Sequence, residues 1–451
     1  MKRISGLYIL DVYLIIVILI SGFAITSGTN LLSDGYTGVQ PLWMKMLSLI
    51  IFISALVPLF MVNTKVLFYK PSIFKIVLLS IIFIVTIVNL FLLKNDYTYV
   101  VTKNDHTYEF IYHAEPFNYF WYPTQMLVAL IIAFLIMDFM PKIMPGNRFI
   151  YLMCIVMLCI GTGAIIYSVL NEKEIYMFYL KEFDTSKIYN YMAQSFFANK
   201  NSYGIVLFSC IAVCLYMQLR KDRLYWYIPA FIFYAFLIFS VCKTGIIFAT
   251  VLIAMNIISR IAITYNEHVI RNTVYVSLLV STAIVLTVFY FTNESVNRAF
   301  KDIFDWLINS EDTKTFTGRL NVWKYSIEVI SQNNFITGVG HGFFSEIVDI
   351  YTKIPLEPTF IKDNVENAYM QMLGDGGGIM LFIFFVFLTL IVINASKIFK
   401  KNKHVAMFSL VFLITMLGYS VFEGGNIIIP FTPEYGMLAM LAASPLYFKN
   451  A

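Results

Sequence analysis

The stretch GGIMLFIFFVFLTLIVINAS, residues 377–396, decides the class of fold. It carries no charged side chain, and nearly every residue after the two glycines is apolar. A helix rises about 1.5 Å per residue, so roughly 20 such residues span the hydrocarbon core of a bilayer, which is about 30 Å thick. We therefore expect this stretch to be a transmembrane helix.

Apolar runs of similar length recur along the chain and leave only short gaps between most of them. They predict an all-α polytopic membrane protein with about twelve transmembrane helices. The expected spans are 7–26, 42–62, 73–93, 122–140, 149–170, 202–219, 224–242, 244–263, 272–292, 377–396, 404–422 and 427–448. The composition excludes a soluble protein, because 59% of the 451 residues are hydrophobic and only 13% are charged.

The basic residues predict the orientation, because short cytoplasmic loops keep Lys and Arg while outer loops do not. Placing Lys2 and Arg3 inside also puts residues 220–223 and 397–403 inside, so both termini are expected in the cytoplasm.

Residues 1–26 resemble a secretory signal, but the apolar run is long, so we expect an uncleaved first span. The net charge of +5 is dispersed along membrane edges, which argues against a nucleic-acid partner.

Cysteine usage predicts neither a disulfide framework nor a metal centre. All five cysteines fall within or at the ends of expected spans, where the expected role is that of a small apolar residue in helix packing. No Cys/His pattern indicates a zinc site, and we expect no metal and no cofactor.

One long polar segment interrupts the apolar pattern and divides the chain into three parts. Residues 1–292 contain spans one to nine, residues 293–376 form a large outer loop, and residues 377–451 contain spans ten to twelve. A loop of this length is expected to be functional. Two shorter outer loops, 94–121 and 171–201, are rich in Tyr and Phe, and their rings either lie at the headgroup level or stack on sugars.

The large outer loop is expected to be partly helical. The pattern predicts a helix from Thr317 to about Ser331, with one face formed by Arg319, Trp323, Ile327 and Ile330. Residues 338–344, GVGHGFF, form a glycine-rich turn whose backbone N–H groups can approach a ligand or another helix closely. A second short helix is expected from about Asp363 to Leu373, where glycines end it.

Two cations are candidates for binding a diphosphate. Lys243 lies at the break between two apolar runs, where burying a charge costs about 2.5–3.5 kcal/mol, so a phosphate partner or a snorkelling position would explain it. Arg319 lies in an otherwise acidic loop, and its guanidinium can bind phosphate bidentately or form a structural ion pair.

Three residues are candidates for proton transfer. Asp363 and Glu366 are three residues apart on the expected short helix, and a pair of like charges raises one pKa toward values useful for a base. His341 in the glycine-rich turn competes for the same role. The alternatives are solvated carboxylates and a structural histidine.

Four segments resemble the bacterial O-antigen ligase and Wzy-type polysaccharide polymerase superfamily. They are Phe197 to Gly204 opening a span, Cys242 to Gly245, the helix from Gly318-Arg319 to Trp323 followed by Gly338-Val339-Gly340, and Glu366-Asn367 to Asp375-Gly376. Each motif is short, but their order relative to the spans matches the family. The resemblance covers roughly residues 195–450.

The resemblance implies a GT-C-type helical fold and a metal-independent membrane glycosyltransferase. Such enzymes move a glycan from undecaprenyl diphosphate to a sugar hydroxyl at the outer face of the bacterial cytoplasmic membrane. The implied partners are undecaprenyl-diphosphate-linked glycans, the bilayer, a chain-length regulator and a flippase. The implied site residues are Lys243 and Arg319 at the diphosphate, Glu366 with His341 or Asp363 in proton transfer, and Asn201, Trp323, Asn367 and Asp375 in substrate binding.

The chain departs from the family pattern at three places. Cys242-Lys243 replaces a common Ser-Arg, which keeps the charge but loses the bidentate fork. Glu366-Asn367 replaces His-Asn, so Glu366 either acts as the base or orients the acceptor and leaves the proton to His341 or Asp363. Asp375-Gly376 stands for a usual Glu-x-Gly.

The sequence favours a polysaccharide polymerase over a ligase. Both use the same chemistry, but the acidic outer loops suit an anionic lipid A core poorly as an acceptor. A lipid-linked oligosaccharide flippase is the alternative from another class, and the large outer loop argues against it. A metal-dependent transferase would need paired acids in an outer loop; the weak candidates are Asp302 with Asp305 and Glu311 with Asp312.

Overall fold

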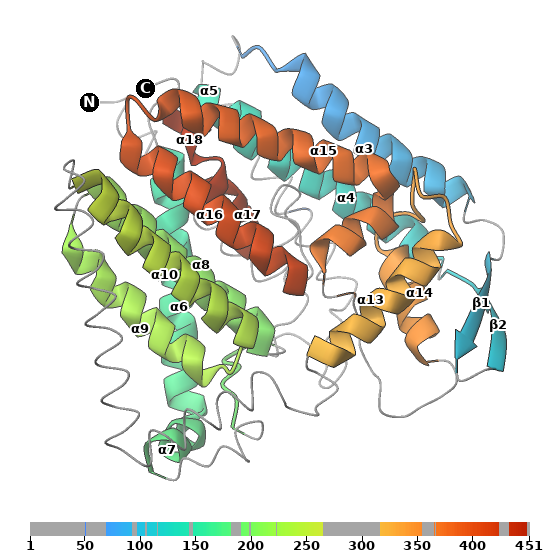
Figure 1. Ribbon diagram of the computed structural model, residues 1–451, viewed down its shortest axis with the longest axis horizontal. Helices are drawn as coiled ribbons and strands as arrows, with labels where there is room; N and C mark the ends of the chain where they lie inside the picture. The colour runs from blue at the N-terminus through green and yellow to red at the C-terminus, as the bar shows by residue number, and fades with distance from the viewer. Residues whose placement is uncertain are drawn as a thin grey trace. The chain divides into compact units, whose positions relative to one another are not determined.

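The computed structural model falls into two compact units (Figure 1). It describes residues 50, 69–92, 97–103, 106–114, 116–143, 148–181, 191–197, 200–221, 223–264, 316–353, 365, 367–423 and 433–448. Unit 1 comprises Met1–Val62, Ile150–Glu311 and Ala395–Thr415, and unit 2 comprises Asn63–Phe149, Asp312–Asn394 and Met416–Ala451.

The described residues form mostly helices, and seven of these are long and apolar enough to cross a membrane. They are Ile73–Leu92, Asn118–Ile143, Phe149–Asn171, Lys200–Lys221, Lys243–Ile263, Ala368–Ile398 and Lys403–Phe422. The expected helical, polytopic membrane protein is therefore confirmed. The number of about twelve stays a prediction. The spans expected at 7–26 and 272–292, and nearly all of 42–62, lie outside the described residues. The span expected at 224–242 is a shorter apolar helix, Leu224–Phe239, and that expected at 427–448 is described only from residue 433, as two short helices.

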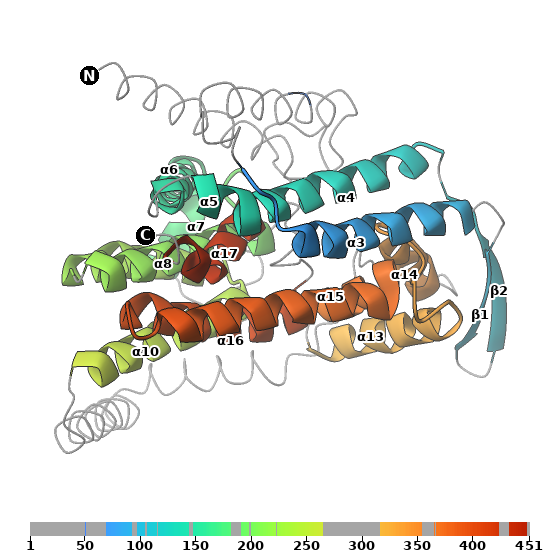
Figure 2. The ribbon, with the colours of Figure 1, turned by 90° about the horizontal axis from the view of Figure 1, so that it is seen from above.

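Unit 1 is built around one buried helix, α8 (Lys200–Lys221), whose residues from Tyr203 to Leu219 are all buried. The other described elements of this unit are α6 (Arg148–Asn171), α7 (Lys173–Lys181), the short 3-10 turn η4 (Leu224–Trp226), α9 (Tyr227–Phe239) and α10 (Lys243–Thr264). Helices α8, α9 and α10 lie side by side in Figure 1, and Figure 2 shows α8 and α10 from above. Four of the five cysteines are buried here, and the fifth, Cys159, is exposed; all five are free thiols.

Aromatic rings pack against one another at the end of unit 1 that holds α7. Phe178 stacks on Tyr191 with ring centroids 4.2 Å apart, and Phe197 stacks on Tyr203 at 6.0 Å. Phe178 and Phe197 are buried. Rings that are covered by their neighbours offer no face to a sugar, so packing accounts for the aromatic content of this segment better than sugar stacking does.

Unit 2 combines apolar helices with the described part of the segment that was predicted to be a large outer loop. Its elements are α3 (Ile73–Leu92), β1 (Tyr97–Lys103), β2 (His106–Tyr112), α4 (Asn118–Phe134), η2 (Leu135–Phe139), α5 (Met140–Ile143), α13 (Phe316–Ser331), α14 (Phe343–Lys353), α17 (Pro433–Ala442) and α18 (Ser444–Phe448). Two long helices, α15 (Ala368–Ile398) and α16 (Lys403–Phe422), have residues in both units.

A short π-helix, η2, continues α4 and carries the buried carboxylate of Asp138. Lys142 Nζ lies 2.9 Å from Oδ2 of this carboxylate, Lys75 Nζ lies 3.4 Å from Oδ1, and Ser72 N donates to Oδ2 at 2.9 Å. A buried charge is tolerated when it is paired and hydrogen-bonded in this way. The network ties η2 to the beginning of α3.

The hairpin of β1 and β2 is the β-sheet found among the described residues, and the sequence did not predict it. The strands pair antiparallel, with Tyr97 opposite Tyr112 and Lys103 opposite His106. Tyr99 and Tyr112 are buried in a hydrophobic core that also holds side chains of α13 and α14. Figure 1 shows the hairpin beside α14.

Helix α13 is confirmed, and the structure adds which of its described side chains are buried. It runs from Phe316 to Ser331, and the buried residues are Val322, Ser326, Val329 and Ile330. Ile327 is 56% exposed, and Trp323 is only partly buried. Of the face described from the sequence, Ile330 is buried, while the other buried residues belong to the neighbouring stripe that packs into the core with α14.

Helix α15 contains the break that the glycines predicted. Gly377 has φ 65° and ψ −164°, a conformation that only glycine adopts readily, so a short first segment ends there and the membrane segment follows. The described helix begins at Ala368. Asp363 and Glu366, which were expected on its first turns, lie outside the described residues.

Candidate functional site

The candidate site in unit 2 is built on the loop of residues 335–342 between α13 and α14, called here the glycine turn. Its backbone bonds directly to α15: Val339 N donates to Gly374 O, and Gly340 N donates to Asp375 O, both at 2.8 Å. In return Gly378 N donates to Phe335 O at 2.8 Å. The sequence predicted that the backbone of this turn approaches either a ligand or another helix. In the structure it approaches a helix, α15.

Glycine is needed where the two backbones meet. Gly338, Gly340 and Gly342 have φ of 70°, 109° and 84°, which other residues rarely adopt. A Cβ on Gly338 would collide with Gly374 O, and a Cβ on Gly377 would collide with Ile336 O. The glycines of the turn and of the helix break therefore serve one purpose, which is the close contact between these two segments.

Asp375 fixes the side chain of His341. Oδ2 of this carboxylate lies 3.1 Å from His341 Nδ1 and accepts a hydrogen bond from Gln371 Nε2 at 2.9 Å, while Oδ1 accepts from Gly342 N at 3.2 Å. Asp375 is 2% exposed and His341 is 9% exposed. A carboxylate that accepts from Nδ1–H leaves the imidazole lone pair on Nε2, which is the form of a general base.

The same turn is held by two further helices. Asn89 Nδ2 of α3 donates to Thr337 O at 2.6 Å. Tyr122 of α4 places its ring against Gly342, where a Cβ would lie 2.6–2.7 Å from three ring carbons. The Tyr122 ring also lies edge-on to His341, with centroids 6.4 Å apart.

A second carboxylate, Glu346 on α14, binds three side chains that the sequence did not identify as candidates for the site. It accepts hydrogen bonds from the hydroxyls of Tyr112 and Tyr122 and from Asn118 Nδ2, the last at 2.6 Å. Burial and the bond to Glu346 raise the pKa of Tyr112 well above its usual value, so this hydroxyl remains a donor at neutral pH. The sequence showed only a tyrosine-rich loop, because the partner lies more than two hundred residues away.

Asn367 has a capping role at the start of α15. It is buried, and its Oδ1 accepts hydrogen bonds from Tyr369 N and Met370 N, both at 3.0 Å. These bonds satisfy two N–H groups that the first turn of a helix leaves open. Its predicted place beside the acceptor hydroxyl stays a prediction, since Glu366 before it is outside the described residues.

The other predicted residues of the large loop lie on α13. Arg319 is in its first turn, and its side chain lies outside what the structure describes. Trp323 follows one turn later, and its ring centroid is 6.1 Å from that of Phe422. Two of the four motif segments thus fall within unit 2: α13 with the glycine turn, and the beginning of α15.

The remaining two motif segments meet in unit 1. Lys243 is the first residue of α10, directly after the break that follows α9, and Asn201 is in the first turn of α8. A Cβ on Gly204 of α8 would lie 2.6 Å from both Cβ and Sγ of Cys242, so the two segments are in close contact. Val241 has φ 55°, an unusual value for a β-branched residue, which marks a strained turn just before Lys243.

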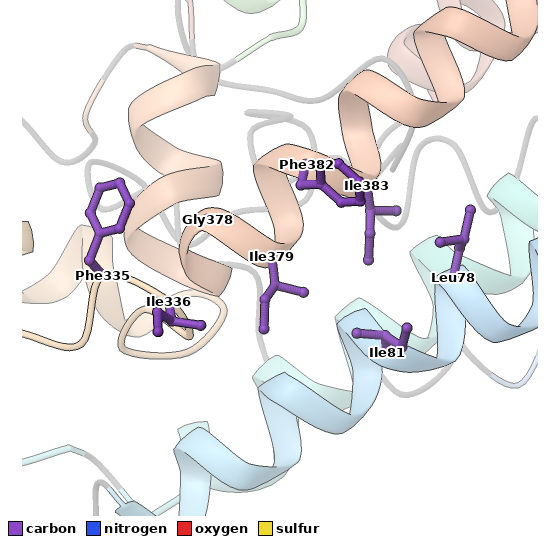
Figure 3. Close-up of a pocket in the computed structure, with 8 residues that line it drawn as sticks. All are labelled: Leu78, Ile81, Phe335, Ile336, Gly378, Ile379, Phe382 and Ile383. Carbon is purple, nitrogen blue, oxygen red and sulfur yellow. The ribbon is translucent and has the colours of Figure 1, made fainter.

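An apolar groove of about 500 Å³ borders the glycine turn in unit 2 (Figure 3). Its lining comes from α3, the glycine turn and the part of α15 after the break: Leu78, Ile81, Phe335, Ile336, Gly378, Ile379, Phe382 and Ile383. Phe335 and Ile336 are each 61% exposed, although they belong to the turn. The groove therefore connects the turn to the apolar sides of two membrane helices.

Comparison with known families agrees with the resemblance read from the sequence. Residues 191–386 match the family model described as O-antigen ligase. This segment includes the Asn201 and Lys243 segments of unit 1, together with α13, the glycine turn and the break in α15. No curated protein matches the chain.

Proposed function

We propose that this membrane protein, whose residues 191–386 match the family model described as O-antigen ligase, transfers glycans from a lipid diphosphate carrier to a sugar hydroxyl. The observation that supports the proposal is the glycine turn, in which His341 Nδ1 lies 3.1 Å from Asp375 Oδ2 and of which Phe335 and Ile336 line an apolar groove. A lipid-linked sugar has one polar and one apolar part, and the turn carries a polar pair and also borders an apolar groove.

The reaction breaks the bond between the anomeric carbon and the diphosphate oxygen and forms a bond from that carbon to the acceptor oxygen. The acceptor hydroxyl loses its proton to a base, and the lipid diphosphate leaves with the electron pair. We assign the proton to His341, held by Asp375, with Glu366 orienting the acceptor. Lys243 and Arg319 stabilise the leaving diphosphate, as cations do where negative charge develops.

The other sequence-predicted residues take supporting roles in this proposal. Asn201 and Trp323 contribute to the binding of the glycan, and Asn367 fixes the start of α15 next to Glu366. Asp363 remains a second candidate for proton transfer. The proposed reaction needs no metal and no cofactor, and activity that survives EDTA would agree with this.

The acceptor distinguishes two forms of the function. A polymerase adds the chain to a new lipid-linked repeat unit, and the acidic outer loops favour it. A ligase adds the chain to a terminal acceptor, and the description of the matching family favours it at least as strongly. In both forms the proposed place is the outer face of the bacterial cytoplasmic membrane, with a flippase supplying donors and a chain-length regulator as a further partner.

Deleting the gene separates the two forms through what accumulates on the lipid carrier. Single repeat units on the carrier would identify the polymerase, whereas long lipid-linked chains would identify the ligase. An unchanged lipid-linked pool outside the membrane would contradict both.

Substitutions test the proposed chemistry in purified protein given a lipid-diphosphate glycan donor. Lys243→Gln, Arg319→Gln, Glu366→Gln and His341→Gln should each reduce transfer, on the order of 100-fold where an acid–base or charge-stabilising group is lost. Lys324→Gln is the matched control, because Lys324 is an exposed cation on the same helix as Arg319. A flippase would tolerate the loss of Glu366, so lipid translocation without any glycan transfer by the wild-type protein, together with unchanged translocation by Glu366→Gln, would overturn the proposal.

A further inference from the structure

We propose that Tyr122, anchored by Glu346, is a positioning residue that holds His341 in place for proton transfer. The inference rests on the proposed function, because it concerns the residue assigned there as the base. It adds α4 and the first turn of α14 to the site, and no sequence motif points to either.

The ring of Tyr122 touches three consecutive residues of the chain. It lies edge-on to His341 at 6.4 Å, against the backbone of Gly342, and edge-on to Phe343 at 5.0 Å. Since Gly342 has no side chain, the ring reaches the backbone itself, and φ of 84° at Gly342 turns the chain around it. A shift of this ring would therefore move the backbone that carries His341.

Glu346 determines where the ring of Tyr122 lies. Its carboxylate accepts hydrogen bonds from the hydroxyls of Tyr122 and Tyr112 and from Asn118. Bonds to an ionised acceptor are stronger than bonds between neutral groups. Because Glu346 is in the first turn of α14, directly after the glycine turn, its position follows that of His341 closely.

The imidazole is thus held from two sides. Asp375 of α15 binds Nδ1 at 3.1 Å, and Tyr122 of α4 packs against the ring edge and the following backbone. Proton transfer requires a base within hydrogen-bond reach of the hydroxyl, and displacements near 1 Å lower rates by about 100-fold. Support of this kind keeps a functional side chain in its productive position.

Tyr112 provides a matched control. Its hydroxyl binds the same carboxylate as that of Tyr122, but its ring belongs to β2 and packs into the core of the hairpin with α13 and α14. Tyr112→Phe and Tyr122→Phe each remove one hydrogen bond to Glu346. If the cluster only stabilises the fold, the two variants should behave alike.

The first test is a double-mutant cycle measured as glycan transfer per folded protein. Tyr122→Phe should lower kcat by about 10-fold and leave KM for the lipid donor within about 2-fold, while Tyr112→Phe stays close to wild type. In a His341→Gln background the effect of Tyr122→Phe should disappear, because Tyr122 acts through His341. Equal effects of the two tyrosine variants, or additive effects with His341→Gln, would overturn the proposal.

The second test does not depend on activity. Diethyl pyrocarbonate modifies imidazoles, and peptide mass spectrometry follows the rate of modification at His341 in the full-length protein in detergent. Tyr122→Phe should raise that rate several-fold, and Tyr112→Phe should not. A changed rate in a protein that transfers no glycan would contradict the proposed function but support the positioning role; an unchanged rate would exclude the positioning role.

Discussion

Oδ2 of Asp375 lies 3.1 Å from Nδ1 of His341, although the two residues belong to different elements and are separated by α14. The same carboxylate binds Gly342 N and Gln371, and the carbonyl of Asp375 accepts from Gly340 N. A single residue of α15, Asp375, therefore fixes both the backbone of the glycine turn and the orientation of its histidine.

Replacing the carboxylate of Asp375 should impair catalysis more than folding. Asp375→Asn keeps the size and an oxygen that can accept from Gly342 N, but its amide N–H₂ favours the wrong imidazole tautomer. We expect transfer to fall on the order of 100-fold, with a small change in thermal unfolding temperature. Glu109→Gln, an exposed carboxylate on β2, is the control; a similar loss there would show that the effect is not specific.

Gly377→Ala should destabilise the protein. The backbone there has φ 65° and ψ −164°, and an added Cβ would collide with Ile336 O. The conformation alone costs roughly 1–3 kcal/mol for a residue with a side chain. Thermal unfolding in lipid vesicles measures this, and Gly163→Ala is the control, since its Cβ would meet nothing within 4 Å. Equal unfolding temperatures for the two variants would contradict the expectation.

Asp138→Ala should be strongly destabilising, because it leaves the ammonium groups of Lys75 and Lys142 near a buried site without their carboxylate. Breaking a buried pair costs about 3–5 kcal/mol. Lys142→Met should cost much less, since the Lys142 side chain is 38% exposed and Lys75 still pairs with the carboxylate. Chemical unfolding of both variants in detergent checks the order, and the reverse order would contradict the role of the pair.

The hairpin should loosen when its link to α13 is removed. Gln332 Oε1 accepts from Val100 N at 3.1 Å, and Gln332 Nε2 donates to Val100 O at 2.9 Å. Gln332→Ala removes both bonds, which should lower the local stability by about 1 kcal/mol. Faster amide exchange over 97–112 would show it. Ser331→Ala serves as the control, because Ser331 bonds only to its own helix at Glu328 O.

Cysteine labelling tests the predicted orientation. A cysteine placed at His106, exposed at the tip of the hairpin, should react with a membrane-impermeant maleimide in intact cells. A cysteine at Asn402, among the lysines between α15 and α16, should react only after the membrane is opened. Cys159→Ser is introduced first, since Cys159 is the exposed native thiol among those described. The opposite pattern would invert the orientation.

The sequence determined the class of fold and the position of several segments. Apolar length alone predicts membrane helices, because the bilayer requires every backbone polar group to be satisfied within the helix. Local patterns also predicted α13 and the break at the glycines near Gly377, since helix periodicity and positive φ are properties of neighbouring residues. The family resemblance came from short motifs and is confirmed by the match over residues 191–386.

Only the tertiary structure decided which residues meet. The hairpin of β1 and β2, the buried face of α13, and the contacts of Glu346 with Tyr112 and Tyr122 depend on segments more than two hundred residues apart. The sequence placed His341 in a turn and Asp375 near a helix break, but their contact requires the backbones of the glycine turn and α15 to touch. The physical reason is that periodicity describes one element at a time, whereas packing and hydrogen bonding choose among the faces that each element offers.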